Sequence, residues 1–435
     1  MSHVHERTLR VRSLARVEGE GAMRVKLVDG RVREARLDIY EPPRFFEAFL
    51  RGRAYTEAPD ITARVCGICP VAYQTSACRA MEDACGVRVQ GQLAELRRLL
   101  YCGEWIESHA LHIHLLHAPD FLGCPDGIAL ARTHRAEVER GLAVKRIGNA
   151  LMELLGGRAI HPVNVRLGGF HRLPTRAELR AFTPSLRQAL DLALETTAWV
   201  AGFAFPEVSV DHRLVALDQG DRYPIDGGDL VRTDAGDVFE VRDFEDRVRE
   251  HQVPHSTALH AELVGVGRYL TGPLARYTLH SSRLSPQAAA AAREAGLGPE
   301  CRNPFRSIVV RAVETVYAIE EALRIVEDYD PDPSRRPAVD VPPRAGRGSG
   351  ASEAPRGLLY HGYDLAADGV ITRARIVPPT AQNQAAIETD LSTLVADHQD
   401  LDDAALTALC ERAIRNHDPC ISCAAHFLDL HVERT

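Results

Sequence analysis

Two cysteine pairs have the spacing of a metal-binding loop. Cys66 and Cys69 lie in the segment RVCGICP, and Cys420 and Cys423 lie in the segment HDPCISCAAH. With 10 cysteines in 435 residues, chance supplies roughly 0.2 pairs at this spacing, so two pairs are an excess. Thiolates three residues apart can chelate one ion, and the flanking Gly and Pro residues suit a tight turn. The four cysteines are therefore candidate metal ligands.

The spacing alone allows several kinds of site. A structural zinc site is the simplest interpretation, and a redox dithiol is a weaker one. Charged side chains flank both loops, at Arg64 and Asp418, and His426 follows the second loop. Zinc held for structure needs no such neighbours, whereas soft thiolates also bind nickel, copper and iron–sulfur centres. A redox metal is an open alternative. The other cysteines are scattered, and we expect inert buried thiols at Cys78, Cys85, Cys102, Cys124, Cys301 and Cys410.

Hydrophobic periodicity predicts the elements that position these loops. From Thr8 to Tyr40 apolar and polar residues alternate around Asp29-Gly30, which predicts a small antiparallel sheet with a tight turn. From about Gln92 onward the period becomes helical and predicts a buried bundle. The longest apolar stripes span residues 93–117, 136–155, 187–203 and 310–329.

The last third of the chain changes character twice. Residues Pro331 to Gly357 are crowded with Pro, Gly, Ser and Arg, which predicts a long surface loop. A hairpin with Asp368-Gly369 at its turn and a helix around LDDAALTALCERAIRN are expected after it.

Composition excludes several functions. The 52 Lys and Arg residues against 60 Asp and Glu give a net charge of -8, which disfavours nucleic acid as a partner. No apolar stretch approaches the length of a membrane span, and the first residues have no apolar core that could serve as a signal peptide. We expect a cytoplasmic protein with no membrane segment and with reduced thiols.

Seven segments, taken together with the cysteine loops, resemble the large, catalytic subunit of nickel–iron hydrogenases. The segment CGICPVAYQ is most similar to the cytosolic, NAD(P)-linked branch of the family, whose members are also called sulfhydrogenases. The resemblance implies an α+β fold, mostly α, and reversible heterolytic cleavage of dihydrogen. The segments are RVEGEG at 16–21, RFFEAFLRGR at 44–53, SHALH at 108–112, GGRAIHPVNVRLGG at 156–169, GPLAR at 272–276, EAPRG at 353–357 and DPCISCAAH at 418–426.

The resemblance also implies roles for the cysteines. Cys66 and Cys420 would be terminal thiolates on nickel, and Cys69 and Cys423 would bridge nickel to an iron that carries carbon monoxide and cyanide. Heterolysis needs a base beside the metal, because dihydrogen is a very weak acid. Cys420 would be that base, and Glu18 would pass its proton outward.

Further residues are implied around the metals. Pro355 and Arg356 would lie at their open face, with Asp418 holding the guanidinium in place. Thr380 would substitute for a hydroxyl residue that several members have at the position of Pro379. Glu47, the backbone carbonyl near Arg375 and His426 would form a magnesium site.

Four histidines near residue 110 invite a metal interpretation, but we interpret them as polar members of a helix that lines the site. In the family, His109 and His112 correspond to groups around the metal ligands, and His114 and His117 follow them. Tyr73 stands where the family often has His, and Ser108 stands where many members have Asp. These departures leave the metal ligands intact.

Partners are implied as well. Since no other cysteine set suggests a cluster, electrons would leave through a small iron–sulfur subunit, and flavin-containing subunits would reduce NAD(P). A maturation protease would cleave after His426 once nickel-insertion factors have acted. The layout expected is one large catalytic domain over 1–435: a β-rich segment at 1–60, a helical core at 61–330, the loop at 331–357, a metal-binding segment at 358–426 and a possible cleaved extension at 427–435.

Two related alternatives share this fold. A regulatory hydrogen sensor would keep the metal ligands but usually lack a cleavable tail. A quinone-module subunit of the respiratory complex I type would lack the metal, and the four retained cysteines argue against it.

Overall fold

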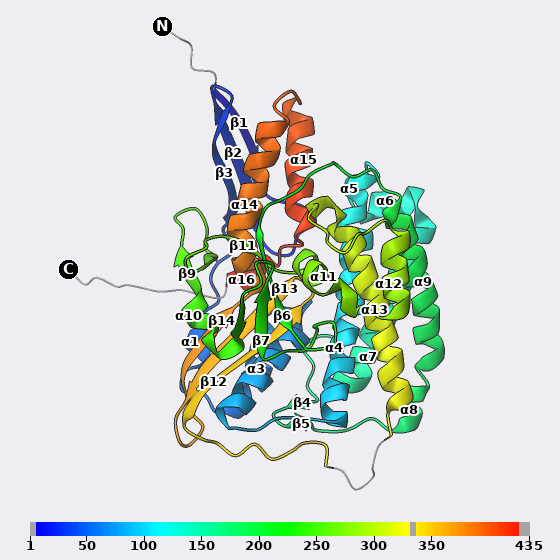
Figure 1. The fold of residues 1–435 in the computed structure, drawn as a ribbon, viewed down its shortest axis with the longest axis vertical. Helices are drawn as coiled ribbons and strands as arrows, with labels where there is room; N and C mark the ends of the chain where they lie inside the picture. Colours follow the sequence, from blue (N-terminus) through cyan, green and yellow to red (C-terminus); the bar gives the residue numbers. More distant parts are fainter. Residues whose placement is uncertain (1–5, 331–335, 426–435) are drawn as a thin grey trace, which may run out of the picture.

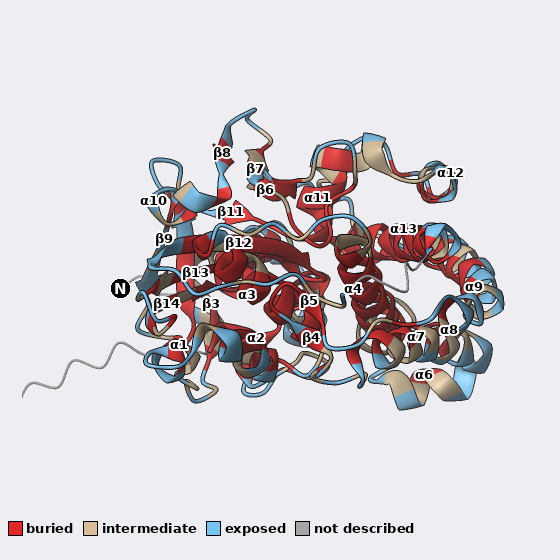
Figure 2. Ribbon diagram, turned by 90° about the horizontal axis from the view of Figure 1, so that it is seen from below, coloured by how far each residue is buried: buried red, intermediate tan, exposed pale blue. Residues whose placement is uncertain are grey.

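Helices α4 (Gln92–Leu111) and α13 (Ser307–Asp328) form the buried centre of a helical layer. The computed structural model describes residues 6–330 and 336–425. Helices α7 (Arg135–Gly156) and α9 (Thr183–Ala201) pack on this centre (Figures 1 and 2), so the four longest apolar stripes are confirmed as helices. Shorter helices complete the layer: α5 (Ala118–Phe121), α6 (Gly127–Thr133), α8 (Arg176–Arg180), α11 (Pro273–His280) and α12 (Pro286–Glu294).

The N-terminal segment forms the predicted antiparallel sheet of β1 (Glu6–Val11), β2 (Gly21–Val28) and β3 (Arg31–Ile39). Its tight turn is at Asp29 and Gly30, whose φ angles are 50° and 71°. Helices α14 (Pro379–Asp397) and α15 (Asp403–Asn416) lie beside this sheet (Figure 1). Their apolar side chains share one core with the sheet, so the N-terminal and C-terminal segments of the chain fold against each other.

A second antiparallel sheet lies on α3 (Pro70–Ala84) and consists of β12 (Gly346–Ala354), β13 (Gly357–Leu365) and β14 (Ile371–Val377). The β13–β14 hairpin confirms the prediction around Asp368-Gly369. The predicted surface loop over 331–357 is wrong for 346–354, which is a strand whose last residues are buried. A Cβ on Gly348 would lie 2.0 Å from the Ala80 carbonyl oxygen, so the small residues that suggested a loop instead allow the strand to contact the helix backbone.

Strands also interrupt the helical core expected over 61–330. They are too short for an alternating pattern to stand out in the sequence. The small strands are β4 (Val165–Arg166), β5 (Gly169–Phe170), β6 (Arg213–Asp218), β7 (Leu230–Thr233), β8 (Val238–Glu240), β9 (Val248–Gln252), β10 (Leu259–Leu263) and β11 (Tyr269–Leu270).

Four short helices lie near chain reversals: α1 (Phe46–Leu50), α2 (Ala58–Thr62), α10 (Phe244–Arg247) and α16 (Ile421–Ala424). Among the described residues, none of the helices has both the length and the hydropathy to span a bilayer. The fold is α+β with small antiparallel sheets, as the sequence predicts.

The contact between β12 and α3 can be tested at Gly350. A Cβ there would lie 2.4 Å from the Ala80 nitrogen and 2.6 Å from the Ser76 carbonyl oxygen, and neither backbone atom can move aside. We expect Gly350→Ala to lower the free energy of unfolding by about 2–3 kcal/mol, measured as the urea midpoint. The matched control is Gly298→Ala, whose Cβ would be 3.8 Å from its nearest neighbour and which should change little. Equal midpoints for the two variants would contradict the tight packing.

Candidate metal centre and its surroundings

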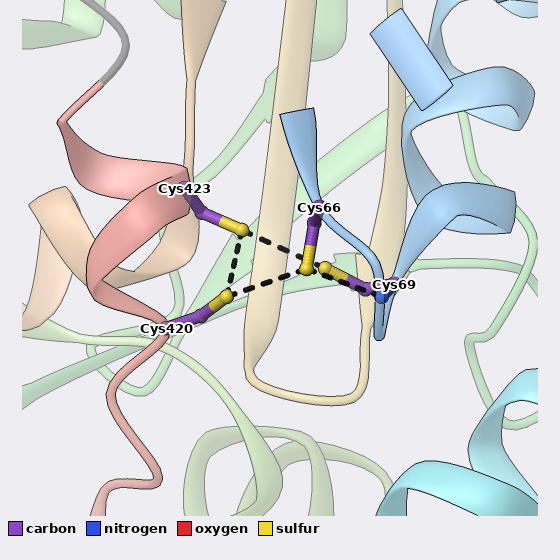
Figure 3. Close-up of side chains that lie close together, drawn as sticks. All are labelled: Cys66, Cys69, Cys420 and Cys423. Carbon is purple, nitrogen blue, oxygen red and sulfur yellow. Dashed lines mark hydrogen bonds between the residues drawn. The ribbon is translucent and has the colours of Figure 1, made fainter. Parts of the chain in front are cut away.

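The four cysteine thiols meet at one buried point between the two loops (Figure 3). The Cys66 and Cys420 sulfurs are 3.5 Å apart, and the Cys69 and Cys423 sulfurs are 3.7 Å apart. All four sulfurs lie within 4.8 Å of one another. Four convergent soft donors with no disulfide between them suit a thiolate-loving metal, so the residues present fit such an ion.

The first loop is fixed by the start of α3. Cys69 precedes the helix and Pro70 is its first residue, a position that tolerates proline. The Ile68 and Cys69 amides both donate to the Cys66 sulfur at 3.3 Å. The buried Glu104 carboxylate accepts the first amides of α3, from Val71 at 2.6 Å and from Ala72 at 3.1 Å.

The second loop follows α15 and leads into α16. Asp418 adopts a φ of 51°, a strained value that turns the chain toward the first loop. The Ile421 amide donates to the Glu18 carbonyl at 2.9 Å, and Glu18 and Cys420 form a parallel β-bridge. Strand-like pairing with the N-terminal segment thus holds the second loop in place.

The thiols have different environments. Hydrogen bonding from Cys420, followed by Cys423 and Cys69, holds the pKa of Cys66 well below its usual range. Burial raises the pKa of Cys420 and of Cys423.

Glu18 contacts the Cys420 sulfur directly. The thiol donates to the Glu18 Oε2 atom at 3.0 Å, and the Ser422 amide donates to the same oxygen at 3.0 Å. Glu18 is only partly buried, so its carboxylate joins the buried thiol to the side of the molecule that water reaches.

Arg356 lies with Pro355 in the turn between β12 and β13. Its Nε donates to the Asp418 carbonyl at 2.9 Å, and its Nη2 donates to the Asp418 carboxylate at 3.2 Å. Burial alone would lower the pKa of Arg356, but the Asp418 carboxylate, followed by the nearby cysteine sulfurs, raises it well above its usual value. Its Nη1 is buried and has no partner among the described residues, which leaves it free to meet a bound group.

A buried network of ion pairs and hydrogen bonds around Arg276 holds this turn in place. Arg276 donates to the carbonyls of Ala354 at 2.9 Å and of Pro355 at 3.0 Å. Its guanidinium also bonds the Glu314 carboxylate at 2.8 Å and the Glu353 carboxylate at 3.1 Å. Sequence reasoning missed the role of these residues. For Glu314 the signal was present, as a charged residue inside the apolar stripe of the α13 segment.

The histidines have ordinary protein partners. His109 Nε2 lies 3.0 Å from the Glu314 carboxylate, and His112 Nε2 lies 2.9 Å from the Arg415 carbonyl. His114 stacks on Trp199, and His117 bonds Asn416. Burial lowers the pKa of all four, that of His109 to about 4, so they are neutral near pH 7. No potential metal-binding group in the described ranges includes them.

The remaining predicted residues lie around the centre. Thr380 Oγ1, in the first turn of α14 after Pro379, accepts the Cys420 amide at 3.0 Å. Tyr73 and Ser108 are buried, and burial followed by the nearby Cys423 thiol raises the pKa of Tyr73 well above its usual value.

The structure describes two of the three residues implied as magnesium ligands. Glu47 on α1 is buried, and its Oε1 accepts the Ile376 amide at 2.7 Å, so its carboxylate lies next to the Arg375 backbone. His426 lies outside the described residues. Arg64 is the middle residue of the short 3-10 turn Ala63–Val65 before Cys66, and it is exposed.

The scattered cysteines match their prediction except in one detail. Cys78, Cys85, Cys102, Cys301 and Cys410 are buried, whereas Cys124 is partly exposed. Burial raises the pKa of the five buried thiols, which keeps them protonated and unreactive.

Comparison with known proteins decides the family. A family model described as nickel-dependent hydrogenase matches residues 44–140. The alpha chain of sulfhydrogenase 1 of Pyrococcus furiosus is 34% identical over 420 residues, covering 96% of this chain and 97% of the relative. The chain belongs to the nickel-dependent hydrogenase family. It is therefore the catalytic subunit of a hydrogenase, an oxidoreductase that acts on dihydrogen, and the family resemblance found in the sequence is confirmed.

A further relative and a solved structure are also similar to this chain. One subunit of the F420-non-reducing hydrogenase vhu of Methanococcus voltae is 30% identical, covering 86% of this chain and 95% of the relative. The crystal structure of an NAD+-reducing [NiFe]-hydrogenase in the H2-reduced state superposes with a TM-score of 0.86 at 29% identity, covering 97% of this chain and 99% of that chain. Both relatives are named as subunits of their hydrogenases.

The ion network beneath the Pro355–Arg356 turn gives a prediction for Glu314. Replacing it as Glu314→Gln leaves Arg276 and His109 without their shared buried carboxylate, and we expect the free energy of unfolding to fall by about 3–5 kcal/mol. The measurement is the urea midpoint at pH 7. The control is Glu327→Gln on the same helix, whose carboxylate is 57% exposed and whose loss should cost under about 0.5 kcal/mol.

The same network predicts how the stability of the protein changes with pH. Burial opposes ionisation of Glu314, but Arg276 holds its pKa at about 2, below the ordinary 4.5. Its contribution to stability is therefore complete above about pH 4.5 and is lost as the pH falls toward 2. The difference between wild type and Glu314→Gln should shrink over that range, and a constant difference would contradict the assignment.

Proposed function

We propose that the chain catalyses reversible heterolytic cleavage of dihydrogen at a nickel–iron centre held by Cys66, Cys69, Cys420 and Cys423. The observation that carries this proposal is the convergence of four buried thiols in a chain of the nickel-dependent family. Cys66 and Cys420 would hold nickel, and Cys69 and Cys423 would hold nickel together with an iron that carries carbon monoxide and cyanide. When bound, the centre supplies redox-active metals that polarise dihydrogen and take up its electrons.

The proton from dihydrogen leaves through Cys420 and Glu18. The Cys420 sulfur accepts it, and the hydrogen bond of 3.0 Å to Glu18 Oε2 lets the proton pass to the carboxylate without rearrangement of either side chain. The Ser422 amide orients the carboxylate. Because Glu18 is partly exposed, it can release the proton toward water, and the same steps in reverse deliver a proton for dihydrogen formation.

Arg356 serves the open side of the centre. Two of its nitrogens are held by Asp418, so the guanidinium is fixed before any ligand arrives. Its unpaired Nη1 would be the donor available to a cyanide ligand or to dihydrogen at a loaded centre. Pro355 shapes the same turn. Thr380 accepts the Cys420 amide and would be the hydroxyl available to a cyanide ligand, and His109 and His112 would be neutral rings near the loaded centre.

A magnesium ion is proposed near the second loop, held by Glu47, the Arg375 carbonyl and His426. A carboxylate adjacent to that backbone supports the assignment. We also propose that nickel-insertion factors load the single catalytic domain and that a maturation protease then removes residues 427–435.

Electrons pass from the centre to a small iron–sulfur subunit, then through flavin-containing subunits to NAD(P). The similarity to an NAD+-reducing hydrogenase supports this acceptor. The free cysteines of the chain, none paired in a disulfide among the described residues, fit a cytoplasmic location.

The centre is tested by metal analysis and infrared spectroscopy of the complex produced with its maturation factors. We expect one nickel and one iron per chain, with carbon monoxide and cyanide bands in a region where protein groups do not absorb. One zinc and no such bands would overturn the proposal. The same preparation tests the finer assignments by intact mass, which reports cleavage after His426, and by hydrogen-dependent reduction of NAD(P)+.

The proton path is tested with Glu18→Gln, which keeps the side chain's size but cannot take up a proton. We expect exchange of dihydrogen with deuterated water to fall by about 10²–10⁴-fold, with nickel content and infrared bands unchanged. Glu20→Gln, on an exposed neighbour, is the control and should keep full exchange. Undiminished exchange in Glu18→Gln would remove Glu18 from the path.

A further inference from the structure

A second group of potential metal ligands lies apart from the cysteines. It consists of His255 in the β9–β10 loop, His260 on β10 and Glu388 on α14. One donor atom from each of these residues lies within 4.8 Å of the other two. None of the three takes part in the proposed chemistry of the nickel–iron centre, so the group needs its own explanation.

His260 is the least satisfied member of this group. The residue is 4% exposed, and its Nε2 is buried with no hydrogen-bond partner among the described residues. The His255 ring lies perpendicular to it, with the ring centres 5.8 Å apart. A buried imidazole nitrogen without a partner is costly. The position therefore favours a bound species that can accept the nitrogen's lone pair.

The other two ligands already face each other. His255 Nε2 lies 2.7 Å from Glu388 Oε1, and the Leu37 amide donates to the same oxygen at 3.1 Å. Tetrahedral zinc with ligand bonds of about 2.0–2.1 Å separates its donors by roughly 3.4 Å. An ion would enter by replacing the hydrogen bond between His255 and Glu388 with two metal bonds, and shifts of about 1 Å would bring the three donors to these separations.

The supporting elements are fixed. The Thr257 amide donates to the Ile39 carbonyl at 2.8 Å, and the Ser256 hydroxyl accepts the Ala258 amide at 3.1 Å. These bonds hold the β9–β10 loop between β3 and β10, and α14 packs on both strands. Ligands on such elements need little ordering to bind an ion.

One further carboxylate lies beside this group. Asp38 on β3 has a buried Oδ1 with no hydrogen-bond partner among the described residues, and its carboxylate interacts with His255 and Glu388.

We propose that His255, His260 and Glu388 form a second metal site, which binds a zinc-class divalent cation and keeps an open coordination position. Two imidazole nitrogens and one carboxylate oxygen are a donor set that suits zinc better than magnesium or calcium. The ion would clamp the β9–β10 loop to α14, the helix whose first turn carries Thr380 against Cys420.

The test is zinc binding to the intact hydrogenase complex after a chelator has removed loosely held metal. Isothermal titration with zinc, followed by gel filtration and metal counting, should give one zinc per catalytic chain beyond nickel and iron. We expect His255→Gln and Glu388→Gln each to weaken binding at least tenfold. Zinc should also raise the thermal midpoint of the wild type but not of these variants.

His398→Gln is the matched control, because it removes a histidine at the end of the same helix that is not among the three ligands. This variant should bind zinc as the wild type does. Zinc that entered an unfilled four-cysteine site would bind equally to all the variants. Equal binding in all four proteins, or no binding in the wild type, would overturn the proposal, whereas the nickel–iron assignment stands or falls on its own infrared bands.

Discussion

The whole structure depends on bringing two cysteine loops, separated by 354 residues, to one buried point. Neither loop can complete a four-sulfur site alone, so the fold has to supply long-range contacts that hold them together. It does so with backbone pairing between Glu18 and Cys420 and with the Arg356–Asp418 ion pair. The N-terminal sheet, the β12–β13 turn and the C-terminal helices are arranged around this requirement.

Buried arginines paired with carboxylates are the second feature that holds the site together. Arg276, Arg311 and Arg356 are fully or almost fully buried, and each has a carboxylate within reach. A buried guanidinium is costly unless its charge is paired with a carboxylate. The network therefore fixes the turn that carries Arg356, and it does so rigidly because each member would be left unpaired if its neighbour moved. Preorganised donors of this kind are what an active site needs on its open side.

Much of this arrangement could be predicted from the sequence. Strong periodicity located α4, α7, α9 and α13, and cysteine spacing located the metal ligands. The strand β12 was missed because its Gly348 and Gly350, which allow contact with α3, have the composition of a loop. Local patterns also could not show that Glu314 and His109 meet, since such pairings arise only from the packing of distant elements. The roles of Glu18 and Arg356 came from family resemblance.

The pairing of Glu18 with Cys420 also has a consequence for the order of events during protein synthesis. At about 5–20 residues per second, roughly 20–70 s separate the translation of Cys66 from that of Cys420. Throughout that interval the first loop exists as an unpartnered dithiol, and the N-terminal strand segment lacks the backbone it will pair with. The second cysteine loop, made long after the first, therefore completes the site, and loading the metals before that completion requires the segment around Cys420 to stay undocked.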